Sequence, residues 1–217
     1  MVFPYQFIKE IDLSLYKMSK LSGGDAMNDK VHRLFVDMDG TLAVFQSVDT
    51  LEKLYEKDYF LNLRPQINVI DGIRFIIKNH PEVEVFILSA VLSDSPYAIP
   101  EKNAWLDKYL PEVDAVHRLY PKCGESKKEF LEREQGGIEQ NDFLLDDYSK
   151  NLHLWDPPAK GIKVMNGING KNGTWVKDKV SIEIDGSKFA ECVLSIMQRR
   201  TCEEEINQFH KVKKGGR

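Results

Sequence analysis

Two aspartates separated by one residue stand directly after a short apolar run. The run is Leu34-Phe35-Val36, and the residues that follow it are Asp37-Met38-Asp39-Gly40-Thr41. If the strand ends at Asp37 and Gly40 permits a tight turn, both carboxylates project into one site. A carboxylate can attack phosphorus to form an aspartyl phosphate, and a second one can protonate the departing oxygen and then deprotonate the attacking water. The spacing therefore makes this segment a candidate for phosphoryl transfer.

Carboxylates and a phosphate group repel one another, so a site of this kind needs cations. A second apolar run, Phe143-Leu144-Leu145, ends at the paired aspartates Asp146 and Asp147. Carboxylate oxygens are ligands that Mg²⁺ prefers in proteins. We therefore expect these two aspartates to hold Mg²⁺ beside the phosphoryl group.

The segment Gly124-Glu125-Ser126-Lys127-Lys128-Glu129-Phe130 offers two lysines that can neutralise phosphoryl oxygens. A helix that begins near Ser126 turns neighbouring side chains about 100° apart, so only one of the two lysines can face the site. Because Phe130 lies three residues after Lys127, we place Lys127 on the inward face. Lys127 is our predicted active-site lysine, and Lys128 is the alternative.

A third apolar run, Val83–Leu88, ends at Ser89, whose hydroxyl can bind a phosphoryl oxygen. The turn after it supplies backbone N–H groups for the remaining oxygens. Taken singly these signals are weak, because an isolated D-x-D-G segment is usually a turn and a serine after a strand is usually a cap. An EF-hand is excluded, since its further oxygen ligands and closing glutamate are missing. The conjunction at successive strand ends favours a catalytic site.

The elements that must position these side chains alternate between buried strands and amphipathic helices. Two apolar stripes with helical spacing lie between the runs, one over residues 69–77 and one over residues 105–110. Strands alternating with helices predict a parallel sheet with right-handed crossovers, whose ligand lies beyond the carboxyl ends of the strands. The predicted fold class is α/β, a Rossmann-like three-layer sandwich. Four further elements are expected: strands at 115–119 and 162–164, a hairpin or edge strand at 175–184, and a closing helix at 187–199.

These segments resemble, in order, the four motifs of the haloacid dehalogenase superfamily, most of whose members are Mg²⁺-dependent phosphatases. The matching segments are Phe35–Leu42, Phe86–Ser89, the downstream lysine, and Leu144–Asp147. The resemblance spans residues 34 to about 151 and is specific for the superfamily. It implies a phosphatase with a small helical cap inserted after the first strand.

The resemblance also assigns roles to single residues. It implies that Asp37 is the nucleophile and Asp39 the general acid and base, and that Ser89 and Lys127 bind the phosphate. It further implies a Mg²⁺ site made by Asp37, Asp39 through its backbone carbonyl, and Asp146, with Asp147 in a supporting position.

A finer resemblance lies between the motifs. The segments Asp58–Pro65, Glu101–Leu106 and Asp146–Leu152, with Trp155, are similar to the cytosolic type C 5′(3′)-deoxyribonucleotidase family. That family dephosphorylates nucleoside and deoxynucleoside monophosphates, so the similarity implies such a substrate. It covers roughly residues 31 to 180.

A physical argument also favours a nucleoside substrate, and it rests on the cap at about residues 43–65. The segment is rich in aromatic residues, and an aromatic surface can stack a base for about 1–3 kcal/mol. Phe45 and Phe60 are our candidates for facing the substrate. The other interpretation is that these rings only pack the cap onto the core. The segment is also shorter than the caps expected of animal nucleotidases, which favours access by other phosphomonoesters.

Composition and the chain ends set outer limits on function. The 217 residues carry a net charge of −4, so a binder of nucleic acid polymers is disfavoured. No apolar run reaches the length of a membrane span, and Lys9, Glu10 and Asp12 interrupt the only stretch that resembles a signal peptide. Three cysteines without a C-x-x-C pair indicate reduced thiols and a cytoplasmic protein.

The predicted organisation has three parts. Residues 1–30 form a leader, either a surface helix before the domain or a dispensable segment ahead of a start at Met27. Residues 31–200 form the phosphatase domain, and residues 201–217 form a charged, frayed tail.

The first hypothesis from the sequence is a Mg²⁺-dependent 5′-nucleotidase that works through an aspartyl phosphate. The second is the same chemistry on a sugar phosphate or another small phosphoester. The third is a non-catalytic protein that binds a phosphate or nucleotide. All three imply a small phosphorylated ligand.

Overall fold

A computed structural model of the chain describes residues 31–45, 50–168 and 174–215. The chain divides into two units, residues 1–30 and 31–217. The predicted leader, with its candidate helix, lies outside the described residues. Among the described helices, none is long and apolar enough to cross a membrane.

Six strands form one sheet in the order β3-β2-β1-β4-β5-β6, and every neighbouring pair is parallel. The strands are β1 (His32–Val36), β2 (Val83–Leu88), β3 (Arg118–Leu119), β4 (Phe143–Asp146), β5 (Lys160–Met165) and β6 (Lys179–Ser181). The chain leaves β1 toward β2 and β3, then returns to the other side of β1 with β4. The strand order therefore reverses between β1 and β4, which is where open parallel sheets bind ligands.

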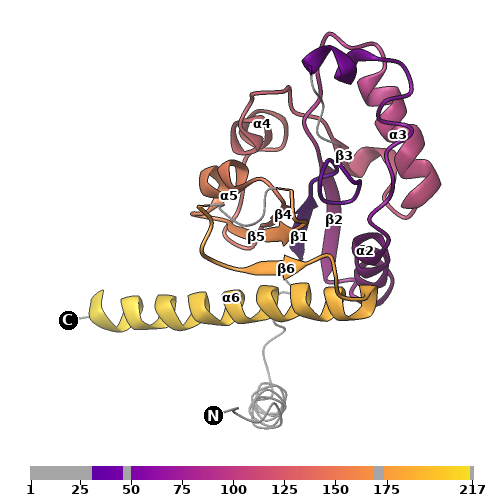
Figure 1. The fold of residues 1–217 in the computed structure, drawn as a ribbon. Coiled ribbons are helices and arrows are strands. Elements are labelled where there is room, and N and C mark those ends of the chain that lie inside the picture. Colours follow the sequence, from indigo (N-terminus) through magenta and orange to yellow (C-terminus); the bar gives the residue numbers. More distant parts are fainter. Residues whose placement is uncertain (1–30, 46–49, 169–173, 216–217) are drawn as a thin grey trace. The chain divides into compact units, whose positions relative to one another are not determined.

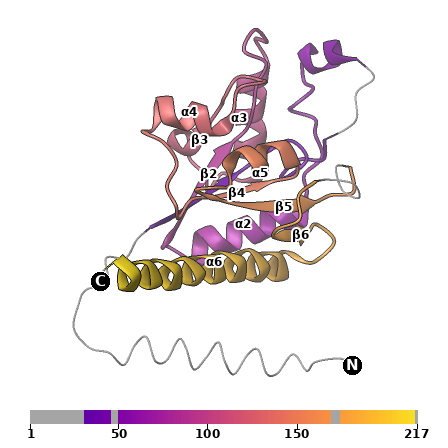
Figure 2. The ribbon, with the colours of Figure 1, turned by 90° about the vertical axis from the view of Figure 1, so that its left-hand side faces the viewer.

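Helices cover both faces of the sheet (Figures 1 and 2). The helices of the described residues are η1 (Leu51–Tyr55), α2 (Ile67–Asn79), α3 (Ala98–Tyr109), η2 (Ala115–His117), α4 (Lys127–Glu134), α5 (Ser149–Trp155) and α6 (Gly186–Gly215), of which η1 belongs to the inserted segment. The side chains of α2, α3 and α6 share one hydrophobic core, and those of α4 and α5 share another. The predicted three-layer α/β arrangement with a parallel sheet is confirmed.

Alternation along the strands fills the two cores. In β1, Leu34 and Val36 point into the core beneath α2 and α6, and Phe35 points into the core beneath α4 and α5. All three side chains are fully buried. Because both faces are covered, apolar residues stand at these three successive positions rather than at every second one.

The segment predicted to form a cap, at about residues 43–65, is bounded by pairing of the chain with itself. Val44 donates its N–H to Arg64 at 2.8 Å, and Gln66 donates its N–H to Leu42 at 2.7 Å. Between these bonds lies an isolated antiparallel bridge of Ala43 with Pro65. The inserted segment thus leaves the core and returns to it at one point, directly after the aspartate-rich turn.

For three elements the structure adds to or changes the expectation from the sequence. The strand expected over 115–119 is mostly the single turn η2, and only its last two residues pair with β2. In the 175–184 segment, β6 pairs in parallel with β5, so it is an edge strand and not a hairpin. The closing helix α6 continues to Gly215, so it extends across the segment that we expected to be a frayed tail.

Candidate active site

Three buried aspartates meet at the carboxyl ends of the adjacent strands β1 and β4. Asp37 follows β1, Asp146 ends β4, and Asp147 follows it; all are at most 7% exposed. The N–H of Asp37 donates to Leu145 at 2.9 Å, which extends the pairing of the two strands to the site. One carboxylate oxygen of each aspartate lies within 4.8 Å of the others. The residues predicted from two separate motifs are therefore brought together by strand pairing.

The turn after Asp37 closes tightly around the carbonyl of Met38. The N–H groups of Leu42 and Ala43 donate to this carbonyl at 2.9 and 2.8 Å. Gly40 has a φ of +87°, and a Cβ at this position would lie 2.4 Å from Oδ2 of Asp147. The turn therefore needs glycine both for its backbone conformation and for the close approach of the Asp147 carboxylate.

Lys127 joins the two strand ends electrostatically. Its Nζ donates to Oδ1 of Asp37 and to Oδ2 of Asp146, both at 2.7 Å, and the residue is 5% exposed. Burial alone would lower the pKa of Lys127, but the two carboxylates outweigh it and raise the pKa above its ordinary value. The ammonium group therefore stays charged. Lys128 is half-buried, so the structure places Lys127, and not its neighbour, against the aspartates.

Asp37 is destabilised as an anion. Burial raises its pKa; Lys127 opposes this shift, and the carboxylates of Asp146, Asp39 and Asp147 add to it. A further cation would relieve this repulsion between buried carboxylates.

Neighbouring side chains fix the orientation of the two aspartates after β4. Asp146 accepts hydrogen bonds from the N–H of Tyr148 at 2.7 Å and from the amide of Asn151 at 2.9 Å. The amide of Asn166 donates to Oδ2 of Asp147 at 2.8 Å and to the carbonyl of Gly40 at 2.7 Å. One amide thus connects the turn after β1 with the end of β4.

The donor set fits Mg²⁺. Three carboxylate oxygens in a buried site with an excess of negative charge are the hard ligands that this ion takes. The group that could hold the ion comprises Asp37, Asp146 and Asp147, so Asp147 lies among the candidate ligands and not only in a supporting position. The carboxylate of Asp39 is not in this group, because it is turned toward another lysine.

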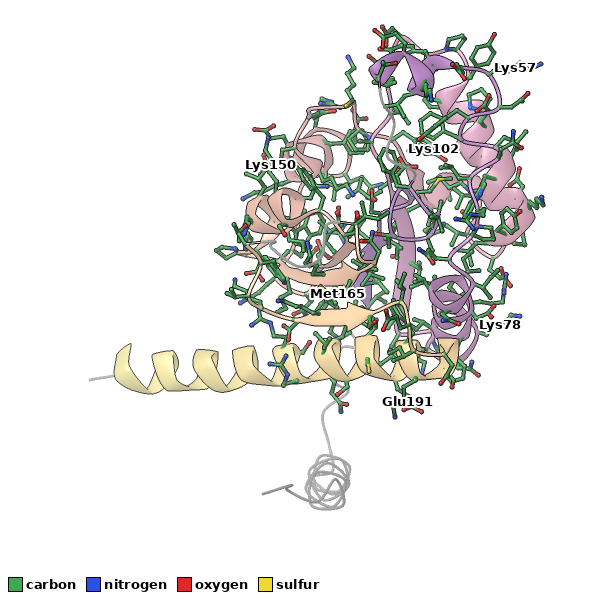
Figure 3. The ribbon with its side chains drawn as sticks, viewed as in Figure 1. Lys57, Lys78, Lys102, Lys150, Met165 and Glu191 are labelled. Carbon is green, nitrogen blue, oxygen red and sulfur yellow. The ribbon has the colours of Figure 1, made fainter. Side chains whose placement is uncertain are left out.

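That lysine is Lys102 on α3, which sequence reasoning missed (Figure 3). Its fully buried ammonium group forms an ion pair with Oδ2 of Asp39 and donates to Oγ of Ser89 at 2.8 Å and to the carbonyl of Ala90 at 2.9 Å. Ser89 is itself fully buried at the end of β2. Because the Ser89 oxygen accepts from Lys102, its own proton is left to donate.

A third buried lysine supports the loop after β4. Lys163 is 1% exposed, and its Nζ donates to the carbonyl of Asp147 at 2.9 Å and to Oγ of Ser149 at 2.8 Å. Burial lowers its pKa, although nearby Asp147 and Asp146 oppose this effect. The site therefore holds four aspartates and three lysines, which leaves one formal negative charge for a metal ion to compensate.

A signal for Lys102 exists in the sequence. Ala98, Lys102, Trp105 and Leu106 follow the helical spacing of one face, and all four are buried. A lysine on an apolar stripe needs a buried partner, because an unpaired buried charge is costly. The stripe predicted above begins at Trp105 and therefore does not include this lysine.

Two cavities open at the site. The first, of about 210 Å³, is lined by Asp37, Asp39, Phe45, Ala90, Asp146, Asp147, Tyr148 and Asn151. The second, of about 730 Å³, lies over α4 and α5 and shares Ala90, Tyr148 and Asn151 with the first. The first is smaller than common ligand pockets and the second is within their range, so the two together offer space for a phosphoryl group and its leaving group.

The two candidate aromatic residues are placed differently. Phe45 lines the smaller cavity beside the aspartates. Phe60 is 4% exposed and packs in the core, with the ammonium of Lys102 4.8 Å from its ring centre. Phe60 therefore contacts the site through Lys102, and its ring does not line the cavity.

Comparison with known proteins gives distant structural likenesses. No family model and no curated protein matches the sequence. D,D-heptose 1,7-bisphosphate phosphatase from Burkholderia thailandensis is 16% identical, with a TM-score of 0.49, over 76% of this chain and 99% of that one. A hypothetical protein from Xanthomonas campestris is 16% identical, with a TM-score of 0.45, over 85% of this chain and 95% of that one. DsGPDH of Dunaliella salina is 15% identical, with a TM-score of 0.41, over 70% of this chain and 27% of that one.

Proposed function

We propose that this chain is a Mg²⁺-dependent phosphomonoesterase of the haloacid dehalogenase type that works through an aspartyl phosphate on Asp37. The observation that carries the proposal is the position of Lys127, which bridges Asp37 and Asp146 at 2.7 Å in a buried site. A nucleophilic carboxylate, a fixed cation and a second carboxylate two residues later are the groups that this chemistry needs.

In the first step, a carboxylate oxygen of Asp37 attacks phosphorus, and the bond between phosphorus and the leaving oxygen breaks. Asp39 donates a proton to that oxygen, so the alcohol departs neutral. Oδ2 of Asp39 is held by Lys102, whereas Oδ1 is buried and has no hydrogen-bond partner among the described side chains. The Asp39 side chain nevertheless lines the cavity beside Asp37, which is where the leaving oxygen would lie.

In the second step, water attacks the phosphorus of the aspartyl phosphate and gives its proton to Asp39. The bond between phosphorus and the Asp37 oxygen breaks, which restores the carboxylate and releases inorganic phosphate. Lys127 and the hydroxyl of Ser89 would hold the phosphoryl oxygens through both steps. Mg²⁺ bound by Asp37, Asp146 and Asp147, and by the backbone carbonyl of Asp39, would neutralise charge on the phosphoryl group.

For the substrate, we propose a nucleoside or deoxynucleoside monophosphate. The supporting observation is that Phe45 lines the cavity beside Asp37, where its ring can meet a planar leaving group, and the adjoining cavity of about 730 Å³ provides room for the rest. The alternative substrate is a sugar phosphate or another small phosphoester. It is favoured by the burial of Phe60, which leaves the cavity with fewer aromatic residues than expected.

Replacing the nucleophile tests the mechanism. In Asp37→Asn we expect phosphate release from deoxynucleoside monophosphates with Mg²⁺ to fall by at least about a hundredfold, because the amide is a poor nucleophile. Glu191→Gln, an exposed substitution on α6, is the matched control and is expected to keep its turnover. Near-normal turnover in Asp37→Asn would contradict the aspartyl-phosphate mechanism.

A substrate panel tests the specificity. Equal kcat/KM on nucleotides, sugar phosphates and simple aryl phosphates would contradict the proposed nucleotide specificity. The proposed phosphatase activity would still stand. Tight nucleotide binding in calorimetry without phosphate release under Mg²⁺ would instead support a binding protein.

A further inference from the structure

Helix α3 carries two adjacent buried charges that face different parts of the molecule. Glu101 is 7% exposed and Lys102 is fully buried. Neighbouring residues on a helix point about 100° apart, so the two side chains reach different groups. Lys102 contacts Asp39 and Ser89 in the site, whereas Glu101 contacts the cap.

The Glu101 carboxylate accepts two backbone hydrogen bonds from the returning part of the cap. The N–H of Asp58 donates to Oε1 at 2.5 Å, and the N–H of Phe60 donates to Oε2 at 3.0 Å. Asp58 has a φ of +68°, a conformation that side-chain-bearing residues rarely adopt and that needs support from its surroundings. One turn further along α3, the indole N–H of Trp105 donates to the carbonyl of Leu63 at 2.8 Å. This face of α3 therefore fixes the cap backbone from Asp58 to Leu63.

Fixing Phe60 also fixes the surroundings of Lys102. The three N–H groups of the Lys102 ammonium are used by Asp39, Ser89 and Ala90. The Phe60 ring lies 4.8 Å from the same nitrogen and is attracted to it by a cation–π interaction. The ring keeps water away from the ammonium group, so the position of Phe60 influences how firmly Lys102 holds Asp39.

We propose that Glu101 is a positioning residue for the proposed phosphatase reaction: it anchors the cap so that Phe60 packs on Lys102, and Lys102 then orients the Asp39 carboxylate and the Ser89 hydroxyl. The inference rests on the proposed function. It assigns the cap a second role besides contact with the leaving group, because the cap also completes the surroundings of the general acid.

The test compares Glu101→Gln with Glu56→Gln, the same change on an exposed carboxylate of the cap. A glutamine offers one acceptor oxygen, and its NH₂ group faces the second N–H donor. We expect faster amide hydrogen exchange in a peptide covering residues 55–63 for Glu101→Gln only. We expect its kcat to fall about ten- to hundredfold, since small misplacements of catalytic groups have effects of this size. The rise in thermal midpoint with Mg²⁺ should be unchanged.

Because Glu101→Gln is a buried change, a second variant addresses the next contact separately. Phe60→Leu keeps an apolar side chain and both backbone hydrogen bonds to Glu101, but it removes the ring from Lys102. We expect a lower kcat on both p-nitrophenyl phosphate and deoxythymidine monophosphate, with KM nearly unchanged. Exchange in residues 55–63 should stay as in the wild type.

The outcomes separate the two proposals. If the wild type releases phosphate and both variants keep its kcat, the positioning role is overturned and the proposed function stands. Unchanged exchange in Glu101→Gln would also overturn it. If the wild type releases phosphate from neither substrate with Mg²⁺, the proposed function fails, and the positioning role fails with it.

Discussion

Lys127 and Lys128 are adjacent residues of the same type with different surroundings. Lys127 contacts Asp37 and Asp146, while Lys128 is half-buried beside it. The chain therefore provides a matched pair for measuring what a buried lysine contributes, since the same substitution can be made at both positions.

We expect Lys127→Met to reduce phosphate release by at least about a hundredfold, as losing a group that stabilises the transition state does. It should also lower the free energy of unfolding, by up to about 3–5 kcal/mol, because two buried carboxylates lose their cation. Lys128→Met should keep most of its turnover and stability. Turnover assays and denaturant unfolding measure both effects, and similar losses in the two variants would contradict the assignment of Lys127.

At the scale of the elements, the turn after β1 and the end of β4 hold each other in place. Asn166 bonds to both, and Gly40 leaves no room for a side chain beside Asp147. Gly124 has nearly the same φ, +88° against +87°, but a Cβ there would meet nothing within 4 Å. Alanine at the two positions imposes similar backbone strain, and only at Gly40 does it displace a carboxylate.

We expect Mg²⁺ at about ten times its dissociation constant to raise the thermal midpoint of the wild type by about 3–6 °C. Gly124→Ala should keep this rise, whereas Gly40→Ala should lose most of it because Asp147 is pushed away. Thermal denaturation with and without Mg²⁺ makes the comparison. A full rise in Gly40→Ala would show that Asp147 is not a ligand.

Prediction from the sequence was effective where a residue stands at the end of a strand. The apolar runs gave the positions of β1, β2 and β4, and parallel strands must bring Asp37, Ser89 and Asp146 to one edge. Lys102 and Lys163 lie within a helix and a strand, so they contact the site only through tertiary packing. Phe60 shows the same limit, since its aromatic character does not tell whether a ring faces a cavity or the core.

At the scale of the whole molecule, the stability of the domain depends on titrating groups that lie away from the site. His117 is the last residue of η2, and its ring has Nδ1 2.6 Å from Asp114 and Nε2 3.1 Å from Glu84 on β2. Partial burial would lower its pKa, but hydrogen bonds to Asp114 and Glu84 outweigh this and raise the pKa above its ordinary value. Protonated His117 therefore stabilises the folded state.

This contribution is present in full below the unfolded-state pKa of about 6.5 and is lost as the pH rises through the higher folded-state pKa. We expect His117→Gln to have a lower unfolding free energy than the wild type, and we expect this loss to be larger at about pH 5.5 than at about pH 8.5. Denaturant unfolding at both pH values measures the difference. His153→Gln is the matched control, because its ring bonds to the hydroxyl of Thr174 and not to carboxylates. If His117→Gln lost the same unfolding free energy at both pH values, the stabilising role of protonated His117 would be contradicted.

The strand order has a consequence for how the chain acquires its site. Asp37 and Lys127 are 90 positions apart, and the third member of their contact, Asp146, comes later still and reaches Asp37 only when β4 pairs with β1. Parallel pairing of distant segments closes long loops, which is a slow event in folding. The proposed metal site therefore cannot exist in a partly folded chain that lacks β4. Metal binding during refolding would mark the docking of that strand, so the ion would stabilise only the chain in which the central sheet is complete.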